Sequence, residues 1–315
     1  MSKVRAVIVD PNVPGRLALR DVEAPTPAAN EAVIRVAAIS LNRGEVRRST
    51  TAEAGWRPGW DLAGVVETPA TDGSGPIAGT RVVGLLRSGA WGELVSVPTH
   101  SLAELPSSVS FAQAATLPVA GLTAYHVLLK GGSLLGRSVL ITGASGGVGH
   151  FAIQLARLSG ARVVAHIRRA EHETFVKDAG AHFVVVGEEL SSASQYDPYH
   201  LIVESVGGNI LGTALGLLAE DGTVVVFGTS GGQEVTFNAQ RFYGTGGASL
   251  YGLILFHELK KESAAVGLRR LLSLVEADKL HPPIEIEAEW TRIADVAQKL
   301  LDRSYLGKAV LHLSN

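Results

Sequence analysis

The run VLITGASGGVG, residues 139–149, constrains the fold of this chain more than any other segment. It has the pattern of a buried strand that leads directly into a glycine-rich turn and then into a helix. Ala144-x-Gly146-x-x-Gly149 places the smallest residues where the turn is tight, where the backbone must approach a pyrophosphate, and where helix and strand touch. The free amides of a helix N-terminus suit phosphate groups. The segment therefore predicts a dinucleotide site at Ser145, Gly146, Gly147, Val148 and Gly149.

Around this turn, apolar β-branched runs alternate with helical patterns, as expected for parallel strands that are covered on both faces. The expected strands are residues 138–142, 162–166, 182–186, 200–204 and 223–228. The expected helices are residues 148–158, 171–179 and 211–218. This order predicts an α/β fold with a doubly wound parallel sheet.

Arg168 and Arg169 follow the second expected strand, about twenty residues beyond the glycine turn, where a dinucleotide fold distinguishes its two cofactors. An acid at this point accepts a hydrogen bond from the ribose 2′-hydroxyl of NAD, whereas a 2′-phosphate favours a guanidinium group. Neither His166 nor Ile167 supplies a carboxylate, so the sequence favours NADPH. The alternative is that both arginines are simply solvated at a helix start.

Length and composition limit the classes of function. A chain of 315 residues is long enough for two domains. A net charge of −2 with 18% charged residues argues against nucleic-acid binding. The absence of cysteine excludes disulfides and thiolate metal sites. No apolar run has membrane-spanning length, and charges interrupt the N-terminal segment where a signal peptide would be apolar, so a cytoplasmic protein is expected.

The remaining segments predict a second, discontinuous domain. Short strand-like runs broken by Gly, Pro, Asn and Asp fill residues 1–118 and indicate an antiparallel barrel. Helical patterns follow at 259–277 and 293–303, and a strand-like run ends the chain at 308–313. Because the nucleotide fold is already complete, this last strand is expected to return to the first domain. The predicted domains are residues 1–118 with 258–315, for substrate binding, and residues 119–257, for the dinucleotide.

With these residues in view, the chain resembles the zinc-free quinone oxidoreductases, also called ζ-crystallin-like proteins, of the medium-chain dehydrogenase/reductase superfamily. Besides the glycine turn, the resemblance is carried by SLNRGEV (40–46), PGWDLAGVV (58–66), GAWGELVSVP (89–98), AATLPVAGLTAYHVL (114–128), VESVGG (203–208), FGTSGG (227–232) and GKAVL (307–311). The resemblance implies a GroES-like barrel domain and a Rossmann domain. It also implies NADPH-dependent reduction of a quinone or an activated alkene, often by a homodimer.

The same resemblance implies that the metal site of the related zinc-dependent alcohol dehydrogenases is lost. Asn42, Trp60 and Val119 stand where those enzymes carry a Cys, a His and a second Cys. None of the three supplies the thiolate, imidazole or carboxylate that holds Zn²⁺. Gly44 replaces the hydroxyl that relays the alcohol proton. Without a cation to stabilise an alkoxide, quinones and enones are the favoured acceptors, since conjugation already stabilises the charge that develops on them.

The resemblance further implies roles for individual side chains. Asn42 is the expected catalytic residue and would hydrogen-bond either the reduced substrate oxygen or the nicotinamide ribose; its alternative is a turn residue that bonds its own backbone. Asp61 is expected to make inter-domain hydrogen bonds or ion pairs. Trp56 and Trp60 would form an aromatic wall for a flat substrate, unless they belong to the core. Further cofactor contacts are expected from Arg43, Thr123, Ser205, Val206, Gly207, Gly228, Thr229, Ser249 and Tyr251.

Three other functions stay open at this point. One is a zinc-free enoyl reductase acting on acyl thioesters, which would need a basic entrance patch; Arg43, Arg47 and Arg48 are its candidates. The second is an alcohol dehydrogenase-like enzyme, which the missing metal ligands disfavour. The third is a nucleotide-binding, crystallin-like protein without catalytic activity.

Overall fold

The computed structural model describes residues 3–313, which divide into two compact units. Unit 1 comprises residues 3–122 and 259–313, and unit 2 comprises residues 123–258. Each unit has its own sheet and its own hydrophobic core. The chain thus leaves unit 1 once and returns to it once.

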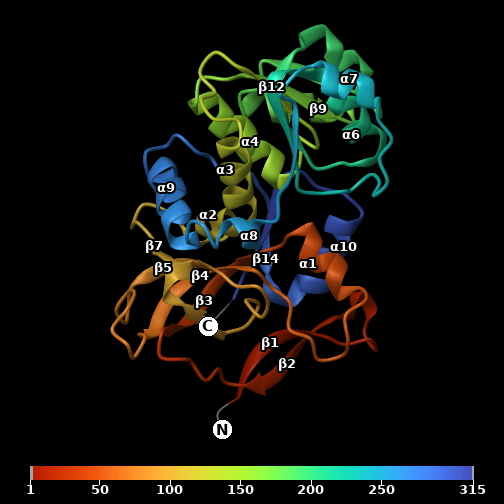
Figure 1. The fold of residues 1–315 in the computed structure, drawn as a ribbon. Coiled ribbons are helices and arrows are strands. Elements are labelled where there is room, and N and C mark those ends of the chain that lie inside the picture. Colours follow the sequence, from red (N-terminus) through yellow and green to blue (C-terminus); the bar gives the residue numbers. More distant parts are fainter. Residues whose placement is uncertain (1–2, 314–315) are drawn as a thin grey trace. The chain divides into compact units, whose positions relative to one another are not determined.

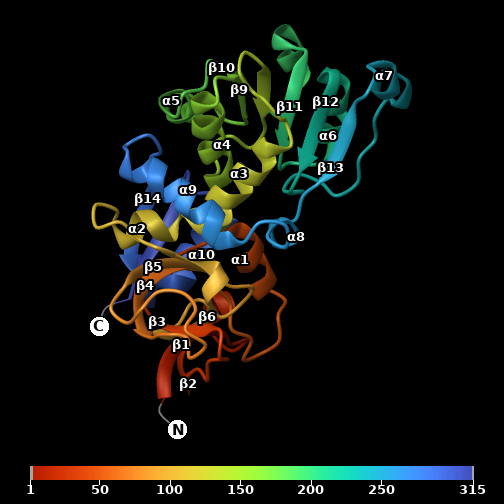
Figure 2. The same ribbon diagram turned by 60° about the vertical axis from the view of Figure 1, so that its left-hand side comes forward.

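Unit 2 contains a six-stranded parallel sheet in the order β10-β9-β8-β11-β12-β13, and Figure 2 shows these strands side by side. The chain starts in the middle, runs outward to β10, crosses back to β11 and runs outward again. This is the strand order of a Rossmann fold, and its topological switch point lies between β8 and β11. The predicted doubly wound sheet is therefore confirmed. The strands are β8 (Ser138–Ile141), β9 (Arg162–Ile167), β10 (Phe183–Val186), β11 (Tyr199–Glu204), β12 (Leu218–Val226) and β13 (Ser249–Gly252).

Helices cover both faces of this sheet because alternate strand residues point to opposite sides. Leu140, Val164 and Ile202 share one buried cluster with α6, which places that helix on their face. The buried residues of α4 lie outside this cluster although α4 contacts β8 and β9, so α4 covers the opposite face. The helices are α3 (Leu122–Leu129), α4 (Gly147–Leu158), α5 (Glu173–Asp178), α6 (Gly208–Ala214), α7 (Ala239–Gly244) and α8 (Leu255–Glu258), with shorter turns η4 (Ala170–His172), η5 (Ser191–Tyr196) and η6 (Leu215–Leu217).

Unit 1 contains a seven-stranded sheet in the order β14-β15-β3-β4-β5-β7, in which β6 also pairs with β3. All its pairs are antiparallel except β14–β15, which is parallel. The C-terminal strand β15 lies beside β3, with Val310 opposite Ser40. A hairpin of β1 and β2 is visible at the red end of the chain in Figure 1. The strands are β1 (Lys3–Val9), β2 (Leu17–Glu23), β3 (Glu31–Ser40), β4 (Asp61–Thr68), β5 (Arg81–Leu85), β6 (Leu94–Pro98), β7 (Leu102–Glu104), β14 (Ile284–Glu289) and β15 (Lys308–His312).

The core of unit 1 combines strand residues with two indoles. Trp91 and Trp290 are fully buried, and they share one apolar cluster with Ile34, Ile39 and Leu62. Within residues 3–313, no helix is long and apolar enough to cross a membrane. The helical elements are α1 (Arg43–Ser49), α2 (Phe111–Ala115), α9 (Ala264–Glu276) and α10 (Ile293–Leu301), with η1 (Pro14–Arg16), η2 (Thr99–Ser101), η3 (Leu117–Gly121) and η7 (Trp290–Arg292).

Candidate functional site

The glycine-rich turn connects β8 to α4 at the C-terminal edge of the unit 2 sheet. Gly146 is the N-cap of α4, and its carbonyl accepts the first helical hydrogen bond from the His150 amide at 2.9 Å. The first amides of a helix have no partner within the helix. The twelve-residue α4 therefore directs the backbone donors of Gly147, Val148 and Gly149 away from its N-terminus, as an anion site requires.

Two glycines of this turn serve different purposes. A Cβ atom on Gly149 would lie 2.6 Å from Ala144 Cα, so the packing of helix against strand itself requires this glycine. A Cβ on Gly146 would meet only the Gly143 oxygen, at 3.4 Å, and Gly146 has φ −84°, which any residue adopts. The protein alone does not require Gly146, so the open space in front of it fits a pyrophosphate that approaches the backbone closely.

Two further loops lie against the turn, because the C-terminal ends of parallel strands meet at one edge of the sheet. The loop after β11 carries Ser205, and the loop after β12 donates to it through the Ser230 amide at 3.2 Å. A Cβ on Gly228 would lie 2.9 Å from the Ser205 oxygen, and one on Gly207 2.2 Å from the Gly232 oxygen. The structure thus brings together Ser145, Gly146, Gly147, Val148, Gly149, Ser205, Val206, Gly207, Gly228 and Thr229.

Glu204, the last residue of β11, lies under these loops and was not predicted as a site residue. Its carboxylate is fully buried and accepts from the Val206 amide at 2.7 Å and from the Gly207 amide at 3.1 Å. The Thr142 hydroxyl, at the end of β8, lies 3.1 Å from the same carboxylate. Burial raises the pKa of Glu204. The only sequence signal was an acid at the end of an otherwise apolar strand.

The two predicted cofactor-selecting arginines follow β9 directly. The Arg168 and Arg169 side chains are 40% and 53% exposed, and their ion pairs with Glu188 at 4.0 Å and Glu171 at 3.6 Å involve well-exposed carboxylates. Such pairs contribute little and exchange easily for a stronger anion. Burial lowers the pKa of His166, whose Nε2 lies 3.0 Å from the Gly187 oxygen. The end of β9 therefore presents two cations and a neutral ring rather than a carboxylate.

Three residues of unit 2 that were expected to contact the cofactor are not among the loop residues that meet at the glycine turn. Thr123 is buried near the start of α3. The Tyr251 hydroxyl donates to Glu258, which also accepts from Lys130 Nζ at 2.7 Å. Ser249 begins β13 and pairs with Thr223 of β12. Thr223 lies three residues before Val226, where β12 ends at the C-terminal edge of the sheet. Since three strand residues span about 10 Å, the structure does not bring Ser249 to the loops.

In unit 1, Asn42 is the N-cap of α1 and the centre of a buried polar network. Its Nδ2 donates to Glu45 Oε1 at 2.9 Å and to Asp61 Oδ2 at 2.7 Å, while its Oδ1 accepts from Lys308 Nζ at 2.7 Å. These partners fix which amide atom is nitrogen and which is oxygen. Both amide hydrogens are therefore engaged, and Oδ1 also accepts from the Glu45 backbone amide in the capping box of α1, so either predicted role for Asn42 would replace one of these partners.

Asp61 and Lys308 form the charged pair of this network. Asp61 accepts from Ser40 Oγ at 2.7 Å and from the Val119 amide at 3.0 Å, and its Oδ2 lies 3.5 Å from Lys308 Nζ. All these partners belong to unit 1, in contrast to the expected inter-domain role. Burial, together with the charge of Asp61, raises the pKa of Glu45 well above its ordinary value, whereas burial lowers the pKa of Lys308.

The residues that stand at the expected metal positions have no metal-binding geometry. The Trp60 indole nitrogen donates to the Arg87 oxygen at 3.0 Å, and its ring lies over Gly44. Val119 contributes only its backbone amide, to Asp61. In the part of the chain that the structure describes, no three His, Cys, Asp or Glu side chains are grouped as metal ligands.

Two other predicted site residues, Arg43 and Trp56, make their contacts with residues of unit 1. Arg43 Nη1 donates to the oxygens of Leu300 and Leu301 in α10, at 3.2 and 3.4 Å. Trp56 packs against the unit 1 core, and the Arg48 guanidinium lies 4.9 Å from its ring centroid. These contacts favour the core interpretation for Trp56.

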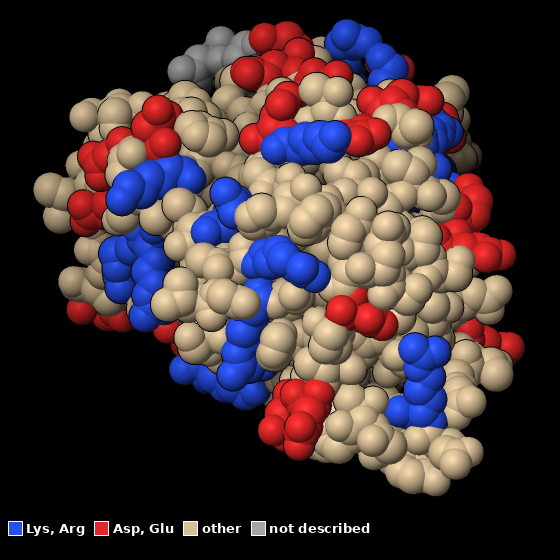
Figure 3. Space-filling model, turned by 90° about the horizontal axis from the view of Figure 1, so that it is seen from above, with Lys and Arg blue, Asp and Glu red and all other residues tan. Residues whose placement is uncertain are grey.

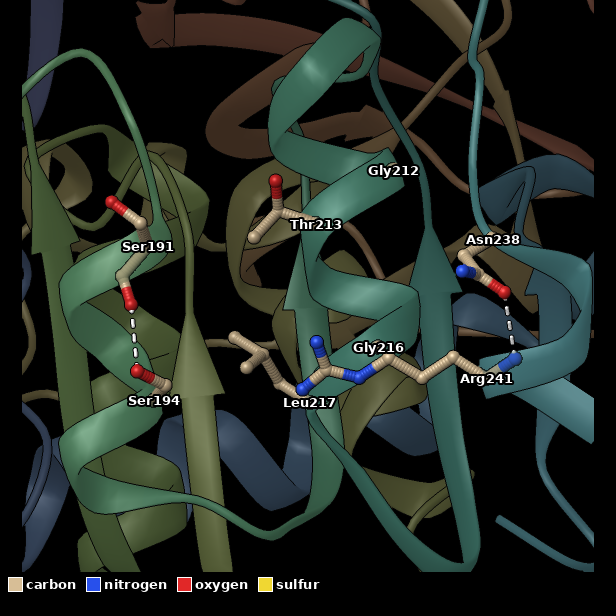
Figure 4. Close-up of a pocket in the computed structure, with 8 residues that line it drawn as sticks. All are labelled: Ser191, Ser194, Gly212, Thr213, Gly216, Leu217, Asn238 and Arg241. Atoms are coloured by element: carbon tan, nitrogen blue, oxygen red, sulfur yellow. Dashed lines mark hydrogen bonds between the residues drawn. The ribbon is translucent and has the colours of Figure 1, made fainter. Parts of the chain in front are cut away.

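A separate small cavity of about 300 Å³ lies beside α6 in unit 2 (Figure 4). Arg241 extends along it, and Asn238 accepts from the Arg241 amide at 2.9 Å. None of its lining residues is a predicted site residue: Ser191, Ser194, Gly212, Thr213, Gly216, Leu217, Asn238 and Arg241. Figure 3 shows both acidic and basic side chains on the face that it draws, with several Lys and Arg side chains gathered over its left and central part.

Comparisons with known proteins identify a matching family model and relatives of similar length. Residues 147–271 match the family model for zinc-binding dehydrogenases. A chloroplast envelope quinone oxidoreductase homologue from Arabidopsis thaliana is 30% identical over 310 residues, covering 92% of this chain and 92% of the relative. The human quinone oxidoreductase is 29% identical, covering 93% and 92%. A mycobacterial protein solved in complex with NADPH has a TM-score of 0.87 and 25% identity, covering 98% of this chain and 99% of that one.

These relatives extend over nearly the whole chain, so the resemblance is not limited to the nucleotide fold. The match supports an oxidoreductase that uses a nicotinamide cofactor and acts on a small molecule. The residue pattern, the Rossmann and GroES-like architecture and the relatives all lead to one assignment. The chain belongs to the quinone oxidoreductase, or ζ-crystallin-like, family of the medium-chain dehydrogenase/reductase superfamily.

Proposed function

We propose that this protein is an NADPH-dependent reductase of quinones or activated alkenes that works without a metal ion. The observation that carries this proposal is the Asn42–Asp61–Lys308 network. A buried ammonium group already balances the Asp61 carboxylate, whose oxygens are occupied by Ser40, Asn42 and Val119. At the expected metal positions, Trp60 and Val119 supply no metal ligand, and the Asn42 amide already bonds Glu45, Asp61 and Lys308.

The proposed cofactor site lies in unit 2. The amides of Gly147, Val148 and Gly149 would hold the pyrophosphate, and the space before Gly146 admits its close approach. Arg168 and Arg169 would bind the 2′-phosphate, since a guanidinium is the best partner for that group. The remaining proposed contacts in this unit are Thr123, Ser145, Ser205, Val206, Gly207, Gly228, Thr229 and Tyr251.

The cofactor, when bound, supplies a hydride from its nicotinamide ring. Within this proposal Asn42 acts as an acceptor. An amide oxygen has two lone pairs, and Oδ1 already accepts from Lys308 and from the Glu45 backbone amide in the capping box of α1, so a ribose hydroxyl would replace one of these two donors. Glu45 and Asp61 hold the amide in that orientation through its two hydrogens. We propose that Asn42 positions the nicotinamide ribose rather than donating to the substrate oxygen.

A site without an electrophilic ion would limit the class of substrate. A bound metal lowers the barrier to carbonyl reduction by several kcal/mol because it stabilises the developing alkoxide. A quinone or an enone spreads this charge over its conjugated system and needs less stabilisation. Conjugated acceptors are therefore the proposed substrates, and plain ketones are expected to react poorly.

We also propose a homodimer. β13 is the last strand of the unit 2 sheet, so one of its edges has no neighbouring strand within the described chain. Near it, Leu250 is 48% and Ile254 is 69% exposed. An edge strand with apolar neighbours is suited to pairing with its own copy about a twofold axis.

An acceptor panel tests the proposed reaction. The loss of NADPH absorbance is measured with p-quinones, alkenals, enones, acyl thioesters and plain ketones, each corrected for its reaction without protein. Turnover of quinones or enones, with ketones at least about a hundredfold slower, is the expected result, because several kcal/mol of missing charge stabilisation correspond to two or more decades in rate.

The panel also separates the competing functions. Turnover restricted to acyl thioesters would replace the proposal with an enoyl reductase. Turnover restricted to plain ketones would contradict the metal-free mechanism. Binding of NADPH without oxidation by any acceptor would indicate a non-catalytic protein.

A further inference from the structure

We propose that Glu204 is a positioning residue that locks together three backbone loops of unit 2: the glycine turn, the loop after β11 and the loop after β12. The inference rests on the proposed function in one respect, since these loops form the proposed cofactor site. Glu204 itself would not touch the cofactor. It would set the distances between the groups that do.

The first link joins the glycine turn to the loop after β11. Glu204 accepts from the amides of Val206 and Gly207, and the Thr142 hydroxyl lies 3.1 Å from its Oε1. Thr142 in turn accepts from the Ser205 amide at 3.1 Å. The end of β8 and the start of the next loop therefore share one hydrogen-bonded centre, at the topological switch point of the sheet.

The second link joins these two segments to the loop after β12. The Ser205 oxygen accepts from the Ser230 amide at 3.2 Å, and the Val206 oxygen accepts from the Gly231 amide at 2.7 Å. Because the Glu204 carboxylate orients the amides of this same loop, its effect extends to residues 228–232, which it does not contact. Ser205 also lies close to the turn, since a Cβ on Gly143 would be 2.5 Å from its hydroxyl.

A carboxylate suits this position better than an amide. Oε1 and Oε2 both accept from Gly207, and Oε1 also accepts from Val206, so donors surround the group on both oxygens. A glutamine would turn an NH₂ group toward one of these donors and leave buried polar atoms unsatisfied. The full burial of Glu204 and the inward direction of these bonds exclude it from direct contact with a ligand.

The test compares Glu204→Gln with wild type, and adds Thr142→Val, which removes the bridging hydroxyl with little change in volume. Glu220→Gln is the matched control, because Glu220 is exposed near the start of β12, at the opposite edge of the sheet. Amide hydrogen exchange is measured without cofactor. NADPH affinity and steady-state kinetics are measured on the same samples.

We expect both site variants to exchange about tenfold faster at residues 143–149 and 228–232, two segments that do not contact the Glu204 carboxylate. We also expect the dissociation constant for NADPH to rise about tenfold while kcat at saturating NADPH stays within about twofold. Such a division between affinity and turnover is not expected of a residue that only stabilises the fold.

Faster exchange confined to Val206 and Gly207 would overturn the inference, and so would unchanged NADPH affinity in both variants. The exchange measurement needs no ligand, so it decides the loop-locking role even if the wild-type protein binds no nicotinamide cofactor. That last result would contradict the proposed function alone.

Discussion

At the scale of single residues, the preference for NADPH depends on Arg168. Its guanidinium is 40% exposed and lies 4.0 Å from an exposed carboxylate of Glu188, so a phosphate could replace this partner. We expect Arg168→Ala to weaken NADPH binding by about ten- to a hundredfold, the range of a lost charge-assisted hydrogen bond, and NADH binding by no more than about twofold.

Titration of both cofactors by fluorescence measures this difference. Arg137→Ala is the matched control, because Arg137 is exposed and precedes β8 at the opposite edge of the sheet. Equal losses for NADPH and NADH in Arg168→Ala would show that the arginine does not recognise the 2′-phosphate.

The residue-level expectations succeeded where the signal was local in sequence. Arg168 could be placed because it follows a strand that the glycine turn locates. Asn42 could be selected as a site residue, but Asp61, which accepts from its amide, lies 19 positions away, and Lys308, which donates to its oxygen, lies 266 positions away. Sequence alone did not reveal that these partners already engage the Asn42 side chain. Glu204 was missed for the same reason: its importance arises from Thr142, which is 62 residues distant.

At the scale of elements, the start of α4 offers a matched pair of glycines. We expect Gly146→Ala to weaken NADPH binding at least about tenfold with little loss of stability, because the added methyl group meets open space in the protein but fills the approach of the pyrophosphate. We expect Gly149→Ala to lower the melting temperature by several degrees, since its methyl group would collide with the Ala144 backbone.

Thermal unfolding and NADPH titration of the two variants check this division. A large loss of stability in Gly146→Ala would mean that packing, and not a ligand, requires that glycine. An unchanged melting temperature in Gly149→Ala would contradict the close helix–strand contact.

The parallel strands were predictable because their apolar runs are buried on both faces. The expected strand at 162–166 and β9 (Arg162–Ile167) differ by one residue. β13 was not predicted, because it has only four residues, which are largely exposed and show no clear apolar pattern. The helix expected at 259–277 begins only at Ala264, where Ser263 is the N-cap with an extended backbone. Helix ends depend on such local caps, which periodicity does not reveal.

At the scale of the whole molecule, two different sequence patterns predicted two domains of different fold class. One part of the chain alternates strands and helices, and the other has short strands broken by turns. The structure places the boundaries after Leu122 and Glu258, whereas the expected ones follow 118 and 257. The first difference arises because η3 (Leu117–Gly121) packs with β4 and β5 of unit 1, a contact that no local pattern indicates.

The central claim for the molecule is that it reduces conjugated acceptors without a metal ion. The most direct measurement is kcat/KM for a p-quinone with NADPH, before and after dialysis against a chelator, together with metal analysis of the same samples. The account predicts an unchanged value and less than one equivalent of metal in the active protein. Loss of activity on dialysis, restored by adding Zn²⁺, would contradict it.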